Sequence, residues 1–405
     1  MSRRSRILVL NQYYTPGLEA TAYLLGELCR ALTDEFDVTV VTGLLPEGRA
    51  PAGRAHEDGV EVIRVWSTTY DRRRLFPRAI NYFTYLVQSL RAALATDRPD
   101  VVLCMTDPPV IANVGLVVAR RFRVPLVVVC QDVFPEIAVH LKRLENPALV
   151  ALLRVMIAHY LRKANRVVAI GEMMRRRLIE KGAPSERVRV ISNWVDTSAI
   201  VPVSRDNPWA RENELTDRFV VMHSGNIGHA QNLEALIRSA TFLRDLDRLA
   251  IVLVGHGARW AELKELTERL DADAVRFLPY QPRDVLSQSL SSADVHVVGL
   301  AHGLSGYVVP SRLYGILAAG RPVLVAADDE SETAHVIREA GCGVVVPPGR
   351  PELLAAAIRQ AHDGDLPLAE MGRRGREFAT AEADRSIAVG RYREVLREVL
   401  NGTGS

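Results

Sequence analysis

The sequence predicts an α/β fold made of two Rossmann-like, doubly wound domains. Three observations lead to this prediction: a length of 405 residues, short and continuously apolar runs along the whole chain, and helical patterns between those runs. A chain of this length exceeds one ordinary core and fits two domains of roughly 150–200 residues. Apolar strands that alternate with helices are typical of parallel sheets covered by helices on both faces.

Short apolar runs predict the strands in order along the chain. In the first half they lie at residues 7–10, 38–41, 60–65, 101–103, 126–129, 167–170 and 188–191. In the second half they lie at residues 219–222, 251–254, 275–278, 295–298, 323–326 and 344–346. Between them, residues 19–32 and 233–243 predict amphipathic helices, because their leucines recur on one face.

A polar, proline-containing stretch at residues 197–213 interrupts this alternation. We therefore predict a first domain at 1–200, a second domain at 201–380, and a helical segment at 381–405. In doubly wound sheets, ligands bind beyond the carboxyl ends of the strands, where the connections change direction. Two such domains facing each other would place both crevices in one cleft.

The composition is that of a soluble globular protein, with 48% hydrophobic and 24% charged residues. The opening segment has only a four-residue apolar run, whereas a signal peptide needs about 7–15 apolar residues. No stretch approaches the roughly 18–20 apolar residues that span a bilayer. The four cysteines are scattered without a CxxC pair, so we expect small buried thiols in a cytoplasmic protein.

The charge is divided unevenly between the two halves. Residues 1–200 hold 28 Lys and Arg against 20 Asp and Glu, a net +8, and the remaining residues carry −5. This asymmetry indicates that one domain faces an anionic partner. Nucleic acid is the less favoured partner, because the basic residues of this half as a whole are not interleaved with aromatic residues as on a strand-binding surface. Residues 70–94, with arginines at 72–74 and 78 beside aromatic residues, suit an anionic bilayer, and residues 175–177 add to the basic balance. A packed helix with solvated arginines explains residues 70–94 equally well.

Two turns after predicted strands contain glycine. The first, residues 11–21, lacks the GxGxxG pattern of dinucleotide-binding domains, which argues against a dehydrogenase. Its glycine, Gly17, fits either an ordinary turn or a loop that approaches a substrate. The second turn reads HSGNIGHAQ from residue 223, and its Gly225 and Gly228 would let backbone amides approach a phosphate before a helix.

Residues 305–323 contain the most specific pattern. Pro310 marks the start of a helix, and Gly320 followed by Pro322 marks its end. The amides of the first helical turn, with Arg312 beside them, would hold a diphosphate, since a guanidinium matches the geometry of phosphate oxygens. A lone arginine at a helix start is more often merely solvated, but the surrounding motif favours the phosphate role.

Five segments carry a resemblance to a known family. They are QDVFPEIA (131–138), ISNWVD (191–196), SGNIGHAQNLE (224–234), VVPSRLYGILAAGRPVL (308–324) and EAGCGVVVPPG (339–349). In these segments the chain resembles glycosyltransferase family 4, whose GT-B fold has two facing Rossmann-like domains and a C-terminal helix that crosses back onto the first. Within the family it is similar to the branch of bacterial L-fucosamine, O-antigen and capsule glycosyltransferases.

The resemblance implies a retaining transfer of a hexosyl or N-acetylhexosaminyl group in cell-surface polysaccharide synthesis. The donor would be a nucleoside diphosphate sugar, which we expect to be UDP-linked, and the acceptor a glycan or a polyprenyl-diphosphate-linked sugar. Fixed amides and Arg312 would stabilise the leaving diphosphate, which takes the proton of the acceptor. Neither a cofactor nor a metal ion is implied, because the DxD triplets at 245–247 and 271–273 fit a helix end and a polar loop. A lipid-linked acceptor would make the protein peripheral on the inner face of the cytoplasmic membrane.

The resemblance also assigns site residues. Three are catalytic: Asp132 and Glu136 at the transferred sugar, and Arg312, in place of the branch's usual lysine, at the leaving phosphate. The residues assigned to the sugar donor are Gly225, Asn226, Gly228, Gln231, Pro279, Tyr280, Pro310, Ser311 and Leu313. Gly17 is added to them because it lies in the turn after the first predicted strand. Pro279 and Tyr280 would hold the nucleotide base.

The chain departs from the family at a pair of glutamates that have seven residues between them. Tyr307 and Gly315 occupy those positions, and Glu332 is the substitute considered for the ribose contact. This loss favours one alternative, a catalytically silent family member that acts as an assembly partner. A nucleotide-sugar epimerase or a phosphorylase on the same fold is the other. A PLP phosphorylase needs a buried lysine, and the second half offers only Lys264, on a polar helix.

Overall fold

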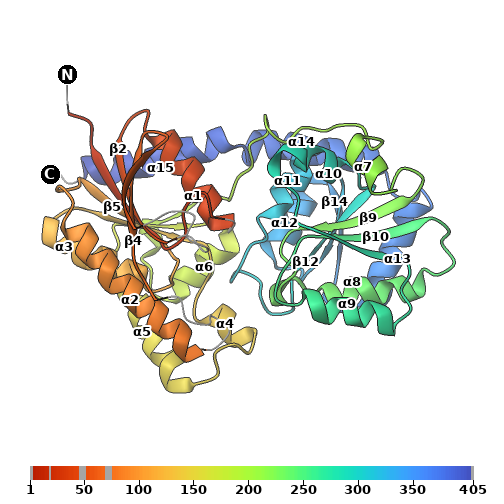
Figure 1. Cartoon of the computed structure of the whole chain (residues 1–405), viewed down its shortest axis with the longest axis horizontal. Coiled ribbons are helices and arrows are strands. Elements are labelled where there is room, and N and C mark those ends of the chain that lie inside the picture. The colour runs from red at the N-terminus through yellow and green to blue at the C-terminus, as the bar shows by residue number, and fades with distance from the viewer. Residues whose placement is uncertain (1–2, 18–19, 45–51, 69–74, 403–405) are drawn as a thin grey trace. The chain divides into compact units, whose positions relative to one another are not determined.

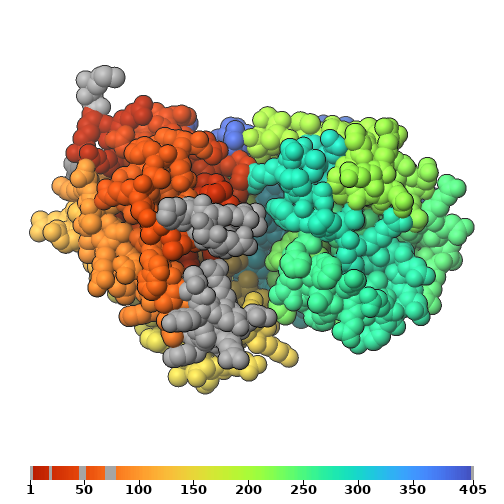
Figure 2. All heavy atoms as spheres, in the orientation of Figure 1, coloured from red at the N-terminus to blue at the C-terminus, as the bar shows by residue number. Residues whose placement is uncertain are grey.

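The computed structural model describes residues 3–17, 20–44, 52–68 and 75–402, and the others are drawn in grey in Figures 1 and 2. The chain divides into two compact units. The first comprises Met1–Ser192 and Ala388–Ser405, and the second comprises Asn193–Ile387. The first unit therefore ends at Ser192, where the sequence suggested residue 200, and the chain returns to it at Ala388 and not at residue 381. Among the described residues, no helix combines the length and apolar character needed to cross a bilayer.

The first unit contains an eight-stranded sheet in the order β3-β4-β2-β1-β5-β6-β7-β8. Its strands are β1 (Arg6–Leu10), β2 (Asp37–Gly43), β3 (Gly53–Glu57), β4 (Val60–Val65), β5 (Val101–Met105), β6 (Leu126–Cys130), β7 (Arg166–Ala169) and β8 (Val188–Val190). The central strands VVLCM and LVVVC are buried along their whole length, as expected for a parallel sheet with two covered faces.

One strand of this sheet was not predicted. β3 reads GRAHE and pairs antiparallel with β4 at the sheet edge, whereas the other pairs of this sheet are parallel. The turn between them, Asp58-Gly59, has φ of 51° and 82°, which is typical of a tight hairpin. An exposed edge strand needs no apolar run, so the sequence pattern missed it.

Helices cover the sheet of the first unit (Figure 1). They are α1 (Ala20–Leu32), α2 (Leu75–Leu94), α3 (Ile111–Phe122), α4 (Glu136–His140), α5 (Pro147–Lys163), α6 (Glu172–Glu180) and, from Ala388 on, α15 (Arg385–Asn401), with a 3-10 turn η2 (Ser185–Arg187). α5 begins where Asn146 caps the amide of Leu149 and Pro147 follows. α15 is held to the unit by ion pairs such as Arg397 with Glu35 at 2.6 Å.

The second unit contains a six-stranded parallel sheet in the order β11-β10-β9-β12-β13-β14. Its strands are β9 (Phe219–Ser224), β10 (Leu249–Val254), β11 (Val275–Leu278), β12 (Val295–Gly299), β13 (Val323–Ala326) and β14 (Gly343–Val346). Its helices are α7 (Pro208–Glu212), α8 (Leu233–Ser239), α9 (Trp260–Arg269), α10 (Leu286–Ser291), α11 (Arg312–Ala318), α12 (Glu332–Ala340), α13 (Pro351–His362) and α14 (Leu368–Glu382), with 3-10 turns η3 (His229–Gln231), η4 (Ala240–Phe242) and η5 (Arg283–Val285). Residues 197–213, suggested as a linker, belong to this unit, where Trp209 of α7 is buried.

Each sheet has one point at which the strand order reverses. In the first unit β1 lies between β2 and β5, and in the second unit β9 lies between β10 and β12. The four cysteines are free and buried, which confirms them as small core residues. Because crevices form beyond the carboxyl ends of strands at such reversal points, the ends of β1, β5, β9 and β12 position the candidate site residues.

Candidate active site

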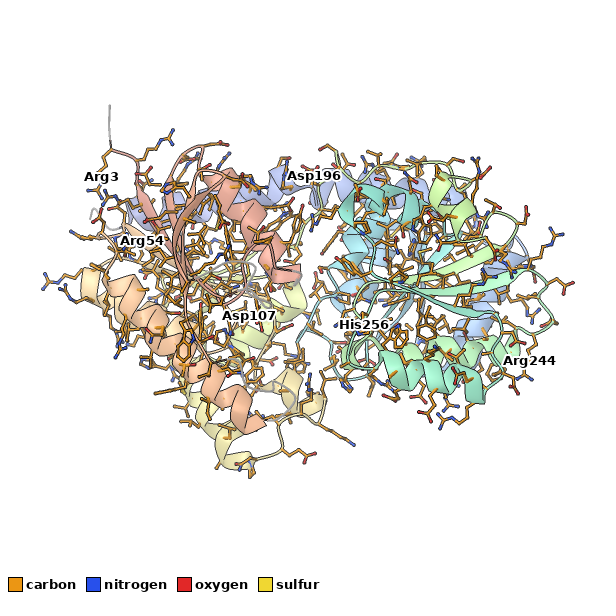
Figure 3. The ribbon with its side chains drawn as sticks, in the orientation of Figure 1. Arg3, Arg54, Asp107, Asp196, Arg244 and His256 are labelled. Atoms are coloured by element: carbon orange, nitrogen blue, oxygen red, sulfur yellow. The ribbon has the colours of Figure 1, made fainter. Side chains whose placement is uncertain are left out.

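The predicted glycine turn of the second unit lies at its reversal point. It follows β9, and it contacts the residues that follow both neighbouring strands. Ile227 N donates to the carbonyl of His256, the residue labelled in Figure 3 beyond β10, at 3.0 Å. Ala301 N, beyond β12, donates to Ala230 O at 2.8 Å. Three loops therefore meet at the carboxyl end of the sheet.

Glycines permit this close packing of backbones. Gly225 has φ of 135°, and an added Cβ would lie 3.3 Å from the guanidinium carbon of Arg312. A Cβ on Gly255 would lie 2.0 Å from Gly225 O, and one on Gly299 would lie 2.1 Å from Gln231 O. Gly228 N donates to the Gln231 side chain at 3.0 Å. Gly225 and Gly255 directly follow β9 and β10, and Gly299 ends β12, so side chains there would push the loops apart.

Arg312 lies against this turn and not in open solvent. Its Nη1 donates to Nε2 of His223 at 2.7 Å and approaches Asn226 O at 3.5 Å. His223 is fully buried at the end of β9, and its Nδ1 lies 3.4 Å from Val297 O. The arrangement assigns the imidazole proton to Nδ1, which leaves Nε2 free to accept from Arg312.

The charge of this pair resides on Arg312. Burial, with the nearby Arg312 cation as a second cause, holds the pKa of His223 well below its ordinary value, so the imidazole is neutral. Arg312 is partly exposed, yet desolvation by the surrounding protein lowers its pKa to about 10. The guanidinium thus stays cationic at neutral pH, and His223 fixes its position.

Other residues assigned to the sugar donor lie at the start of α11 and in the glycine turn. Pro310 and Ser311 precede α11, and their carbonyls accept the amides of Leu313 and Tyr314 at 3.3 Å each. The Leu313 side chain is fully buried, so only its backbone is available to a ligand. Asn226 is exposed at the glycine turn, and Gln231 ends the 3-10 turn that follows.

Pro279 and Tyr280 lie beyond β11, and the Tyr280 ring is 58% exposed. Pro279 O accepts the side-chain amide of Gln281 at 2.8 Å. Gly17, in the first unit, closes a turn by donating its N–H to Tyr14 O at 3.0 Å. Glu332 is the first residue of α12, directly after the cap Ser331.

An aspartate that the sequence reasoning missed organises the loop beyond β12. Asp328, beyond β13, accepts Gly303 N at 2.8 Å, His302 Nδ1 at 2.6 Å and Ser305 Oγ at 3.3 Å. This loop leads into Tyr307, one of the two positions where the family has glutamate. A Cβ on Gly315, the other position, would make only ordinary contacts at 3.7 Å or more.

The first unit brings two carboxyl groups to its reversal point. Asp132 follows β6, and Asp107, labelled in Figure 3, follows β5. Asp107 is positioned from β1, because its N–H donates to Asn11 Oδ1 at 3.1 Å and its carbonyl accepts Gln12 N at 2.7 Å. The sequence reasoning missed Asp107, since a single aspartate before a proline has no distinctive pattern.

The environment of Asp132 favours its neutral form. Desolvation by the surrounding protein, followed by the charge of Asp107, raises the pKa of Asp132 to about 7. Asp132 is nevertheless exposed, so it does not belong to the core. Asp132 is thus available to a ligand.

Glu136 has a different environment, one turn further on. Its carboxylate pairs with Lys181 at 2.6 Å and with Arg154 at 3.1 Å. Although partial burial opposes ionisation, the hydrogen bond and charge of Lys181 hold the pKa of Glu136 below its ordinary value. Glu136 therefore ties α4 to α5 and to the end of α6.

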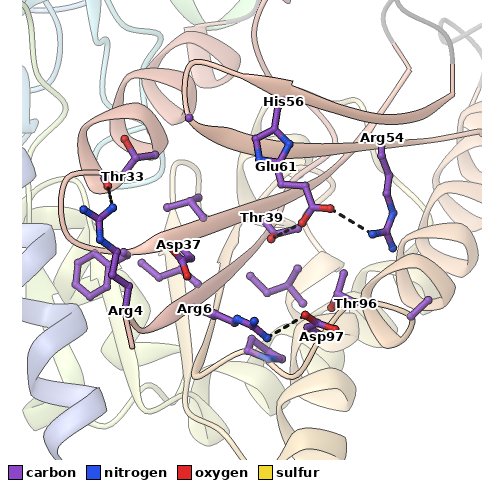
Figure 4. Close-up of a pocket in the computed structure, with 17 residues that line it drawn as sticks. Arg4, Arg6, Thr33, Asp37, Thr39, Arg54, His56, Glu61, Thr96 and Asp97 are labelled. Atoms are coloured by element: carbon purple, nitrogen blue, oxygen red, sulfur yellow. Dashed lines mark hydrogen bonds and ion pairs between the residues drawn. The ribbon is translucent and has the colours of Figure 1, made fainter. Parts of the chain in front are cut away.

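A cavity of about 340 Å³ lies elsewhere in the first unit (Figure 4). Its lining includes Arg6 and Asp37, the first residues of β1 and β2, so it lies at the amino ends of the strands. Four of its charged groups pair with one another, Arg6 with Asp97 and Arg54 with Glu61. We do not assign the site to this cavity, because it is at the opposite end of the sheet from Asp107 and Asp132.

Comparison with protein families decides the identity of the two units. A glycosyl transferase 4-like domain matches residues 19–194, and a glycosyl transferases group 1 domain matches residues 205–378. The chain belongs to glycosyltransferase family 4. Together the two matches span most of the chain, and they confirm the resemblance drawn from the five sequence segments.

Relatives of this family 4 glycosyltransferase include bacterial proteins named as glycosyltransferases. Glycosyltransferase WbjE of Pseudomonas aeruginosa is 25% identical over 98% of this chain and 99% of the relative. The colanic acid biosynthesis glycosyl transferase WcaI of Escherichia coli K12 is 31% identical over 60% of this chain and 57% of the relative. Neither the silent partner nor the epimerase alternative finds support in these relatives.

Solved structures confirm the GT-B fold. Sucrose-phosphate synthase from Thermosynechococcus elongatus superposes with a TM-score of 0.81 at 16% identity, covering 98% of this chain and all of that one. Alr3699/HepE of Anabaena in complex with UDP-glucose gives a TM-score of 0.75 at 16% identity, covering 97% and 99%. At 16% identity, these two structures resemble this family 4 glycosyltransferase in fold, and no more than the fold is inferred from them.

Proposed function

We propose that this glycosyltransferase transfers a hexosyl or N-acetylhexosaminyl group, with retention and without a metal ion, from a UDP-linked sugar to a lipid-linked or glycan acceptor in bacterial cell-surface polysaccharide synthesis. The observation that carries the proposal is the cationic Arg312, fixed by neutral His223 against a glycine turn at the reversal point. The naming of WcaI for colanic acid biosynthesis supports the pathway class. The UDP and UDP-glucose complexes of HepE support the donor class.

The second unit would supply the electrostatic part of catalysis. Breaking the bond between sugar and phosphate adds negative charge to the leaving diphosphate. Arg312 is held in advance by His223 Nε2 and Asn226 O, so it needs no reorganisation when that charge develops. The leaving phosphate then takes the proton of the acceptor hydroxyl on the same face of the sugar. This route gives retention and requires no protein base.

The first unit would hold the transferred sugar and the acceptor. Asp132 offers one carboxyl at the carboxyl end of β6, with Asp107 beside it at the end of β5. Two neighbouring carboxyls with one raised pKa provide both a donor and an acceptor for sugar hydroxyls at neutral pH. Glu136, paired with Lys181 and Arg154, would orient the segment that carries Asp132.

Calorimetric titration with UDP, GDP and ADP, first without metal and then with magnesium, tests the donor assignment. We expect saturable binding of UDP that magnesium does not change. GDP is the informative competitor, because a relative from Mycobacterium tuberculosis, 27% identical over 77% of this chain and 76% of the relative, is named as a GDP-mannose-dependent α-mannosyltransferase. Binding of no nucleotide would refute the enzyme and restore the silent-partner alternative. NMR of the product anomer tests retention, and an inverted anomer would exclude it.

A further inference from the structure

Large hydrophobic side chains gather on one exposed stretch of the first unit. Val139, Leu149, Leu152 and Val155 are 36%, 41%, 55% and 64% exposed. They are four of the twelve large hydrophobic residues found exposed in the described part of the chain, and they all fall within residues 139–155. Single exposed apolar residues need no explanation, but a cluster on neighbouring elements marks an interaction surface.

The helix α5 is apolar on both of its faces. Its inner face buries Val150, Ile157, Tyr160 and Leu161 in the first unit. Its outer face repeats large apolar residues at three-residue steps, at Leu149, Leu152 and Val155, which places them along one side of the helix. A helix that is apolar all round is normally covered on all sides. The outer face of α5 is not covered by the described protein.

The charges around this face are predominantly positive. Residues 136–163 hold five Lys and Arg against two Asp and Glu, a net +3. One of the two acidic residues, Glu136, is already paired with Lys181 and Arg154. Lys142 and Arg143 are exposed in the short connection between α4 and α5. The surface therefore combines apolar side chains with unbalanced positive charge.

The surface is continuous with the loop that carries Asp132. α4 begins at Glu136, four residues beyond Asp132, and the Arg154 guanidinium of α5 donates to Glu136 at 3.1 Å (α4 and α5 are both yellow in Figure 1). The outer face of α5 is thus linked through α4 to the loop that is proposed to hold the acceptor.

We propose that the α4–α5 surface, made of Val139, Lys142, Arg143, Leu149, Leu152 and Val155, docks on an anionic lipid bilayer. The inference rests on the proposed function, because a lipid-linked acceptor presents its sugar at such a surface. A bilayer satisfies both features at once: its acyl boundary takes the apolar side chains, and its phosphate headgroups take the lysine and arginine. A second copy of the chain fits less well, since it would bring the same positive charges face to face.

This surface is independent of the basic segments singled out from the sequence. Residues 72–74 lie outside the described residues. In α6, Arg175 pairs with Glu172 at 2.9 Å and Arg177 with Glu180 at 3.3 Å, so part of that basic run is balanced within its own helix. α2 does expose Phe83, at 67%, but its Tyr85 is buried against the unit.

Flotation of the full chain with vesicles tests the proposal. One set contains phosphatidylcholine alone, and the other contains equimolar phosphatidylcholine and phosphatidylglycerol. We expect binding to the anionic set only. The double variant Leu152→Ser, Val155→Ser should lower the partition coefficient by about tenfold or more, and Lys142→Gln with Arg143→Gln should lower it by about tenfold and remove its salt dependence. Phe242→Ser, which alters a side chain of the second unit that is 53% exposed, is the matched control and should bind as the wild type does.

Three outcomes would overturn the proposal: equal flotation of the wild type and the Leu152/Val155 variant, no flotation of the wild type, or a wild-type dimer in sedimentation velocity that the double variant dissociates. UDP titration of the same samples keeps this test separate from that of the proposed function. A wild type that binds UDP but not vesicles loses the docking surface and keeps the donor site. A thermal melt unchanged by the double variant shows that the fold is intact, since the replaced side chains are exposed.

Discussion

Replacing Arg312 by alanine tests the proposed donor site most directly. The substitution removes two interactions at once: the hydrogen bond to Nε2 of buried His223 at 2.7 Å, and the positive charge offered to a diphosphate. These two losses have different readouts. Loss of the hydrogen bond lowers the free energy of unfolding, and loss of the charge weakens nucleotide binding.

The expected magnitudes follow from the geometry. A buried acceptor left without its donor costs about 1–3 kcal/mol, so the melting temperature of the Arg312→Ala variant should fall. A hydrogen bond to a charged group contributes about 1.5–3 kcal/mol, which corresponds to roughly 10- to 150-fold weaker binding of UDP. Because the branch usually has lysine here, Arg312→Lys should recover most of the affinity by restoring the charge.

Isothermal titration of UDP and a thermal melt on the same samples separate the two effects. Arg269→Ala, which removes an exposed arginine from α9, is the matched control for loss of positive charge and should leave UDP binding unchanged. An Arg312→Ala variant that melts earlier but binds UDP as tightly as the wild type would refute the reasoning. Arg312 would then serve only to satisfy His223.

Three further predictions concern residues around the two reversal points. Gly225→Ala should weaken UDP binding, because its Cβ would crowd the guanidinium at 3.3 Å, whereas Gly364→Ala, with a similar left-handed backbone penalty but open space, should lower only the melting temperature. The Asp132→Asn variant should be as stable as the wild type at pH 4 and increasingly more stable than it as the pH rises to about 7. The folded wild type keeps the proton of Asp132 up to about pH 7, whereas the unfolded chain releases it near 3.8. Ionisation of Asp132 therefore lowers the stability of the wild type alone across that window. A melt that does not respond to pH in this way would contradict the raised pKa of Asp132. Asp328→Asn should weaken the acceptor for Gly303 N and speed hydrogen exchange in residues 302–306, and unchanged exchange there would show that other contacts hold the loop.

Much of the fold could be predicted because parallel strands leave a local signature. A strand buried on both faces, such as LVVVC in β6, must be continuously apolar, and Gly225, Gly228 and Arg312 stand in a pattern of fixed spacing. The edge strand β3 left no such signature, since its side chains face solvent and its hydrogen bonds come from the backbone alone.

Relations through space were beyond the sequence. The sequence pattern predicted Arg312 as a phosphate ligand. Its pairing with His223, 89 residues earlier in the chain, is visible only in the folded structure, where β9 and the start of α11 meet. Asp107 joins Asp132 because β5 and β6 are neighbours in the sheet, and the outer face of α5 is recognisable only once its inner face is known to be buried. Local sequence determines which segments form strands, turns and helices, since those depend on side chains a few residues apart. The order of the strands decides which charged and polar side chains lie close enough to interact, and that order is a property of the folded chain.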